Sequence, residues 1–240
     1  MKTKLITAGL SFAGFSFFAG HCLALTPFSD NFNAIKLDKI NWLAGGEGGA
    51  KLKQDDGVLK FLVPVNKADE DYAFLELVPS RPGYDENWQV LLDVANTNSH
   101  RGNSGPGIWI ANAEDGGDTV FFECYGKGPK GGFVASFVNN GLYNVGPDIG
   151  DNPGVSGGTI RISFNKTTKI MTFAYRVGKT AKWTKVATFS TNGVGGDRRA
   201  NWNMNAETGL FVIKIYGFTE GRIVASGTET LDNFVLKEIK

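Results

Sequence analysis

Rings and carboxylates alternate along residues 118–125 (DTVFFECY). Side chains of an extended strand point alternately to opposite faces, so Val120, Phe122 and Cys124 would share one face. The other face would carry Thr119, Phe121, Glu123 and Tyr125. That set is an unusual way to build a core, because carboxylates are rarely buried without a partner. It suits a sugar, whose apolar C–H surface stacks on rings while its hydroxyls bond polar side chains.

Three further stretches, 71–78, 87–95 and 211–218, show the same mixture on one of their two faces. Trp109, in an apolar run, would be either a sugar platform or a core ring. The residues predicted to contact a glycan are Tyr72, Gln89, Trp109, Glu123, Tyr125, Lys214 and Tyr216. The alternative is that these are ordinary solvated faces, or inner faces whose register is shifted by one residue, since one such slip reverses every assignment.

Catalysis on a sugar would need carboxylates. Glycosidases place two of them beside the scissile bond, one protonated and one ionised. The candidates are Glu76, Asp93 and Glu123, which lie on separate predicted strands and would have to converge. His100 is the single histidine beyond residue 24, so a multi-histidine zinc site is excluded.

The triplet Asp-Asn-Phe occurs near both ends of the chain, at residues 30–32 and 232–234. One interpretation is mechanical: each Phe points inward, and Asp or Asn caps a turn at a strand end. The other is a calcium site built from Asp30, Asn31 and Asp232, because Ca²⁺ prefers carboxylate and amide oxygens.

Residues 1–24 have the pattern of a secretory signal, with Lys2 and Lys4 before an apolar run and small residues at the cleavage position. We therefore expect a secreted or periplasmic protein whose mature chain has no transmembrane anchor.

Loss of the two lysines of the predicted signal would shift the formal net charge from +1 to −1, which gives no sign of a nucleic-acid partner. Cys124 would be the single remaining cysteine, so an internal disulfide is excluded and a buried position is expected for this side chain.

Residues 25–240 show no helical period and many short β-rich runs separated by Gly, Asn, Asp and Pro. The clearest run is 159–164, followed by turns at 165–169 and 178–181 that predict a three-stranded meander. About a dozen strands are too many for one flat sheet, so we expect one domain made of two stacked antiparallel sheets. The glycine-rich segments 45–49 and 146–158 are predicted to be surface loops.

The opening DNFN, the meander RISFNKTTKIMTFAYRVG and the closing LDNFVL together resemble secreted bacterial domains of the concanavalin A-like lectin/glucanase superfamily. The resemblance implies an all-β, antiparallel two-sheet β-sandwich of jelly-roll type, with the first and last strands side by side. It implies a lectin-like domain that binds a polysaccharide or other glycan on its concave face, and structural Ca²⁺ is common among similar proteins. One alternative is a glycoside hydrolase or polysaccharide lyase of the same fold, although the Glu-x-Asp-x-x-Glu strand of the glucanases is absent here. Another is a surface or matrix protein-interaction domain.

Overall fold

A computed structural model gives the fold of the chain outside the predicted signal. The residues that it describes are 25–34, 36–64, 71–98, 104–125, 132–143, 145–219 and 226–240. The predicted signal at 1–24 and His100 lie outside these ranges.

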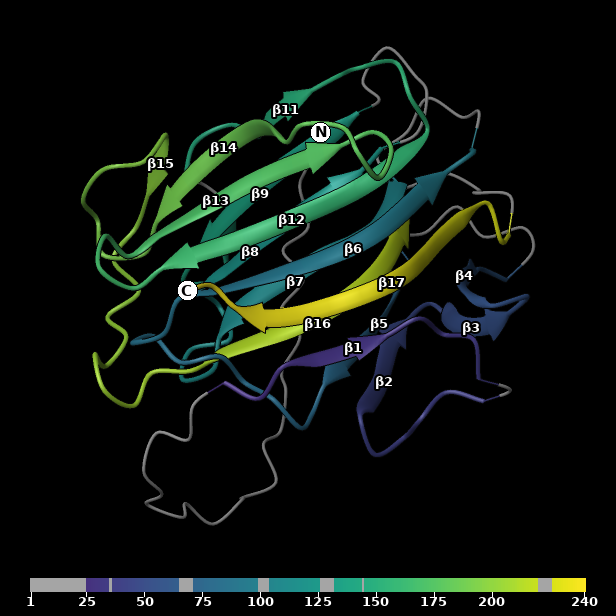
Figure 1. Ribbon diagram of the computed structural model, residues 1–240, viewed down its shortest axis with the longest axis horizontal. Helices are drawn as coiled ribbons and strands as arrows, with labels where there is room; N and C mark the ends of the chain where they lie inside the picture. The colour runs from purple at the N-terminus through teal and green to yellow at the C-terminus, as the bar shows by residue number, and fades with distance from the viewer. Residues whose placement is uncertain are drawn as a thin grey trace.

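The described residues form two stacked β-sheets and no α-helix (Figure 1). Sheet A contains β1 (Phe28–Asp30), β3 (Lys51–Asp55), β4 (Val58–Leu62), β6 (Trp88–Asn96), β12 (Gly157–Asn165), β13 (Ile170–Arg176), β14 (Thr184–Ser190), β15 (Arg198–Arg199) and β17 (Glu229–Glu238). Sheet B contains β2 (Trp42–Glu47), β5 (Asp71–Leu77), β7 (Ser104–Asn112), β8 (Thr119–Cys124), β9 (Phe133–Asn139), β10 (Leu142–Tyr143), β11 (Ile149–Asp151) and β16 (Phe211–Thr219). The predicted two-sheet sandwich is confirmed.

Strand order follows a jelly-roll pattern in which neighbours in a sheet are often distant in sequence. Sheet A runs β15-β14-β13-β12-β6-β17-β4-β3, with β1 beside β17. Sheet B runs β10-β9-β8-β7-β16-β5-β2, with β11 beside β9. The pairs are antiparallel, apart from the short parallel pair β14 and β15. Sheet A forms the front layer in Figure 1, and the strands of sheet B pass behind it.

The predicted meander is β12, β13 and β14. Ile160, Ile162 and Phe164 alternate along β12 and are fully or almost fully buried. The β12–β13 turn closes because the Asn165 side-chain oxygen accepts hydrogen bonds from the backbone N–H groups of residues 167 and 168. Alternation and turn chemistry together therefore set this register.

The two Asp-Asn-Phe triplets do lie side by side. In the pairing of β1 with β17, Asp30 stands opposite Phe234. Phe32 and Phe234 both point inward, and their ring centroids lie 5.9 and 5.1 Å from that of Trp42. Asp30 accepts a hydrogen bond from the Trp42 indole N–H at 2.8 Å. The repeated triplet thus joins the two chain ends around one buried tryptophan.

Two glycine-rich segments were wrongly predicted to be loops throughout. Residues 45–47 belong to β2, and Gly45 is needed there because a Cβ atom would overlap the ring of Phe74 on β5. Segment 146–158 contains β11 and the start of β12. Glycine occurs in these strands because atoms of a neighbouring strand approach the backbone closely. In the sequence such glycines resemble those of a turn.

The core lies between the sheets and is rich in aromatic side chains. Cys124 is fully buried in it, and burial raises the pKa of its thiol to about 12, so the predicted buried role is confirmed. No helix among the described residues is long and apolar enough to cross a membrane.

Candidate functional site

The outer face of sheet B, which points away from the core, carries side chains in regular transverse rows. The first row runs from β5 to β8 through paired positions: Glu76, Lys214, Trp109 and Phe121. The second contains Phe74, Tyr216, Gly107 and Glu123, and the third contains Tyr72, Phe218 and Gly105. Side chains from four strands are therefore neighbours because register aligns them.

Seven rings on this face make one continuous surface, here called the aromatic face. Its members are Tyr72, Phe74, Trp109, Phe121, Tyr125, Tyr216 and Phe218. Neighbouring ring centroids lie 5.3 to 6.3 Å apart, within the range of favourable aromatic contacts. Most of these side chains are half-buried, so one side of the surface stays open to solvent.

Two glycines on β7 allow side chains of β8 and β16 to meet above that strand. At Gly107 the Tyr216 hydroxyl donates a hydrogen bond to Glu123. At Gly105 the ring of Tyr125 approaches that of Phe218, with centroids 5.8 Å apart. A larger residue at either glycine would stand where these contacts form.

We expect Gly107→Ala to lower the free energy of unfolding by about 1.5 kcal/mol, the cost of overpacking. The new Cβ would lie 2.5 Å from the carbonyl oxygen of Phe122 and 3.0 Å from Cγ of Glu123. Gly116→Ala is the matched control, because a Cβ there meets nothing within 4 Å. Urea unfolding of both variants checks this, and equal midpoints would contradict the close packing over β7.

A cation sits among the rings. The ammonium of Lys214 lies 4.4 Å from the ring centroid of Phe74 and 4.3 Å from that of Trp109. It also lies 3.7 Å from the carboxylate of Glu76, which accepts a 3.0 Å hydrogen bond from Arg81. Burial lowers the pKa of Lys214, the Glu76 carboxylate opposes this, and the charge of Arg81 adds to it.

The structure brings six of the seven predicted contact residues together on the outer face of sheet B: Tyr72, Trp109, Glu123, Tyr125, Lys214 and Tyr216. Gln89 lies on β6 in sheet A and is separated from them by the core. Phe218 and Arg81 were missed. Phe218 follows Tyr216 by two residues, so continuing the alternation would have found it.

The three predicted catalytic carboxylates do not converge. Asp93 lies on the outer face of sheet A, where it accepts hydrogen bonds from Thr159 at 2.6 Å and Asn233 at 2.9 Å. Glu76 and Glu123 share sheet B, but β16 and β7 lie between their strands. Three strand spacings place those two backbones about 14 Å apart.

The residues predicted to hold calcium lie near one another at the β1–β17 edge. Burial raises the pKa of Asp232, and the charges of Asp93 and Asp30 raise it further. Donors already point at these oxygens: Phe32 N–H and the Trp42 indole at Asp30, Asn33 N–H at Asn31, and Asn233 at Asp232. Within the part of the chain that the structure describes, no three acidic, histidine or cysteine side chains group as metal ligands would. These residues fit a set of turn caps better than a Ca²⁺ shell.

Comparison with solved structures identifies the fold. Lectin II from Ulex europaeus superposes with a TM-score of 0.58 at 12% identity, covering 88% of this chain and 97% of the lectin. GH43B of the Bacteroides ovatus xyloglucan locus gives 0.60 at 16% identity, covering 92% of this chain and 41% of that one. The chain has the concanavalin A-like fold.

A third concanavalin A-like neighbour is the exoplasmic/lumenal domain of VIP36, solved with Ca²⁺ and Man3GlcNAc, at a TM-score of 0.52 and 10% identity over 84% of this chain and 87% of that domain. No protein-family model matches the chain, and neither does any curated protein sequence. At these identities the likeness establishes the fold alone, so the role of this concanavalin A-like domain must come from its own side chains.

Proposed function

We propose that this concanavalin A-like domain binds a polysaccharide on the outer face of sheet B. The observation that carries the proposal is the aromatic face itself: seven rings in contact, open on one side, with charged groups set among them. A core needs no cation between two rings, whereas a saccharide needs both stacking surfaces and polar partners.

The shape of the aromatic face favours a chain over a single sugar. The rings span β5, β16, β7 and β8, which corresponds to about 14 Å between the outer two strands. Lys214 and Glu76 lie at one end of the first row, and Glu123 lies in the second row, bonded to Tyr216. If the C–H face of a saccharide stacks on the rings, its hydroxyl groups would lie within reach of all three side chains. The lectin and glycosidase neighbours support the proposal at the level of fold.

A hydrolase is the weaker candidate. The two carboxylates of a retaining glycosidase lie about 5 Å apart, and those of an inverting enzyme about 6.5–9.5 Å apart. Glu76 and Glu123 start from backbones about 14 Å apart, and each side chain is held by a neighbour on its own part of the sheet. Binding without bond cleavage is therefore the expected behaviour.

The proposal is tested by incubating residues 25–240 with a panel of soluble and insoluble polysaccharides, with and without Ca²⁺. Depletion of protein and release of new reducing ends are measured in the same tubes. We expect depletion by at least one polysaccharide and no new ends. New ends would make the protein an enzyme, and the absence of any depletion would contradict glycan binding. Depletion that requires Ca²⁺ and is lost in Asp232→Asn would assign a metal to the β1–β17 edge.

Loss of one ring should weaken binding in proportion to the stacking it provides. For Tyr125→Ala and Phe121→Ala we expect about a tenfold weaker Kd, equivalent to about 1.4 kcal/mol. Gln89→Ala is the matched control, because this half-buried side chain belongs to the other sheet. Calorimetric titration with the selected polysaccharide measures all three, and an equal loss in the Gln89 variant would exclude the aromatic face as the site.

A further inference from the structure

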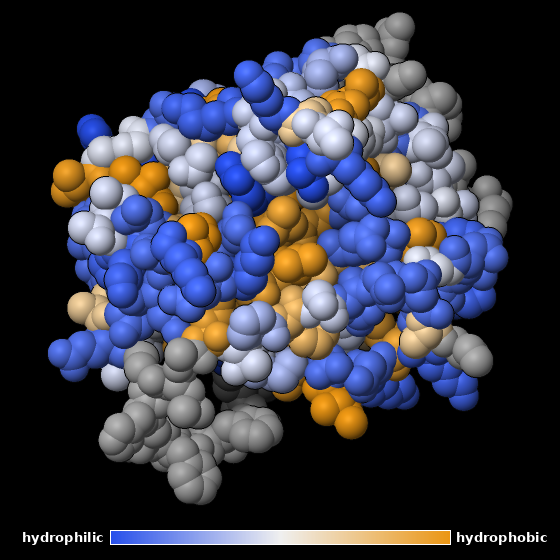
Figure 2. Space-filling view, in the orientation of Figure 1, coloured by the Kyte–Doolittle hydropathy of each residue, from blue (hydrophilic) through white to orange (hydrophobic). Residues whose placement is uncertain are grey.

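The outer face of sheet A carries a different group of side chains. Figure 2 shows this face, with an apolar hollow near its centre bordered by hydrophilic side chains. Arg161 on β12 stands opposite Ala174 on β13, and Arg176 on β13 stands opposite Thr159 on β12. The two arginines are therefore diagonal neighbours on the same face of the sheet.

Both guanidinium groups lie over the same ring. The Cζ atom of Arg161 lies 4.2 Å from the ring centroid of Trp183, and that of Arg176 lies 4.8 Å from it. Trp183 comes just before β14, in the connection that follows β13. A guanidinium group has five N–H donors, and those that stay accessible beside a ring can pair with the two oxygens of a carboxylate, sulfate or phosphate.

Across the described residues, neither arginine lies within 4.0 Å of a carboxylate oxygen. The Nε atoms of both are buried and make no hydrogen bond. Burial and the neighbouring charge of Arg176 lower the pKa of Arg161, so the charge of Arg161 is held there at a cost. Buried donors without partners commonly indicate an ion or water that completes the site.

Nearby acidic groups have other partners. Asp93 is bonded to Thr159 and Asn233, and Asp232 is bonded to Asn233 and near Lys179. On β14 the exposed Lys185 stands opposite Ala174, in the same cross-strand row as Arg161, and adds a further positive charge to this part of the sheet.

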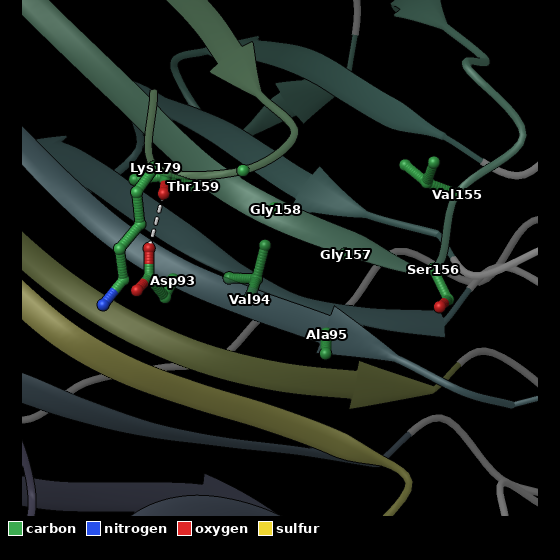
Figure 3. Close-up of a pocket in the computed structure, with 10 residues that line it drawn as sticks. Asp93, Val94, Ala95, Val155, Ser156, Gly157, Gly158, Thr159 and Lys179 are labelled. Atoms are coloured by element: carbon green, nitrogen blue, oxygen red, sulfur yellow. Dashed lines mark hydrogen bonds between the residues drawn. The ribbon is translucent and has the colours of Figure 1, made fainter. Parts of the chain in front are cut away.

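A pocket of about 490 Å³ opens between β6, β12 and the segment that follows β13, and Figure 3 shows the residues that line it. Thr159 lines the pocket and pairs with Arg176 across β12 and β13. Gly178 and Lys179, which follow β13, also line it. Gly157 and Ala95 keep part of the lining free of long side chains. In Figure 3 the Lys179 side chain extends alongside Asp93 at one end of the pocket, away from Val155 and Ser156. A group bound to the arginines would therefore have room for the molecule that carries it.

We propose that Arg161, Arg176 and Trp183 form an oxyanion site on sheet A, separate from the aromatic face of sheet B. It binds a sulfate or carboxylate group of an acidic saccharide, whose adjoining ring occupies the pocket beside Thr159. The oxyanion chemistry follows from the arginine pair alone. That the carrier is a saccharide rests on the proposed function.

The test is a nuclear magnetic resonance titration of residues 25–240 that follows the arginine Nε–H signals. Sodium sulfate, a sulfated oligosaccharide and an oligouronate are added at constant ionic strength. We expect saturable shifts of the Arg161 and Arg176 signals with sulfate, and tighter binding of one of the two saccharides, which identifies the anionic group. Sulfate binding with no gain from either saccharide would overturn the saccharide carrier.

Matched variants separate this site from general charge and from the aromatic face. Arg161→Gln and Arg176→Gln should each weaken sulfate binding at least tenfold. Lys166→Gln, which removes an exposed charge at the far end of β12, should leave it unchanged, as should Tyr125→Ala on sheet B. The proposal would be overturned if no oxyanion gave saturable shifts, or if Lys166→Gln weakened sulfate binding as much as the arginine variants do. The contact between the arginines and Trp183 would then have only a structural role.

Discussion

Trp42→Ala is expected to lower the free energy of unfolding by about 3–5 kcal/mol, the usual cost of removing a large buried ring. Trp42 is 2% exposed and contacts the rings of Phe28, Phe32 and Phe234. Its indole also donates the hydrogen bond to Asp30, so the truncation leaves a cavity and an acceptor without its donor. Domains of this kind are stable by about 5–15 kcal/mol, so the loss is a large fraction of the total.

Two further variants serve as comparisons for Trp42→Ala. The free energy of unfolding of all three is measured with urea at neutral pH. Trp42→Phe keeps most of the ring contacts and loses the indole donor, so its cost should be smaller than that of Trp42→Ala. Ile40→Ala, two residues away at a side chain that is 81% exposed, should change stability by less than about 0.5 kcal/mol. A loss below about 1 kcal/mol for Trp42→Ala would mean that the joined ends of the chain contribute little to the fold.

Glu229→Gln is expected to stabilise the protein at neutral and higher pH. Glu229 is fully buried near Cys124, and among the described residues neither of its carboxyl oxygens has a partner with full hydrogen-bond geometry. Burial raises its pKa well above the ordinary value, the nearby Ser104 hydroxyl opposes this, and the Glu123 charge adds to the rise. Burial therefore favours the protonated form of this carboxyl group in the folded chain.

The sign of the pH dependence follows from linkage. Below the unfolded pKa of about 4.3 both states are protonated, and the wild type and the variant should be equally stable. Above it the unfolded chain releases a proton that the folded chain retains, so wild-type stability falls as pH rises toward the folded pKa. Glutamine has no such proton, so its advantage should grow by about 1.4 kcal/mol for each pH unit between the unfolded and folded pKa values.

Thermal and urea unfolding between pH 4 and 8.5 measure this difference. Glu238→Gln is the control, because Glu238 ends the same strand and is exposed. An advantage of Glu229→Gln that is absent at pH 8, or that is larger at pH 4 than at pH 8, would show that Glu229 has a cationic or hydrogen-bonding partner in solution.

Alternation along single strands was enough to predict which side chains share a face in much of the candidate site. Phe121, Glu123 and Tyr125 share a face because successive side chains of a strand diverge, and this depends on no other part of the chain. The clear pattern of β12 and the Asp-Asn-Phe closure were predictable for the same reason, since local alternation and turn residues agree there.

Sheet membership was not predictable in this way. Gln89 and Asp93 alternate as convincingly as Glu123, but β6 pairs with β12 and β17, so they face the opposite side of the molecule. Pairing between distant strands depends on long-range contacts, which a local pattern does not encode. The role of Gly107 also depends on its neighbours, since it is explained only once Tyr216 and Glu123 are known to stand on either side of it. The cluster of Arg161, Arg176 and Trp183 was not predicted, because its three residues come from three separate segments of the chain.

Binding on the outer face of sheet B is tested most directly by mapping amide and indole chemical shifts during titration with an oligosaccharide of the selected polysaccharide. We predict saturable shifts in β5, β7, β8 and β16, including the indole N–H of Trp109, which has no hydrogen-bond partner within the described part of the chain. At a ligand concentration near the wild-type Kd, Tyr125→Ala should reduce these shifts strongly, as a tenfold weaker Kd requires. Shifts confined to the strands of sheet A, or no saturable shifts at all, would contradict a glycan site on the aromatic face.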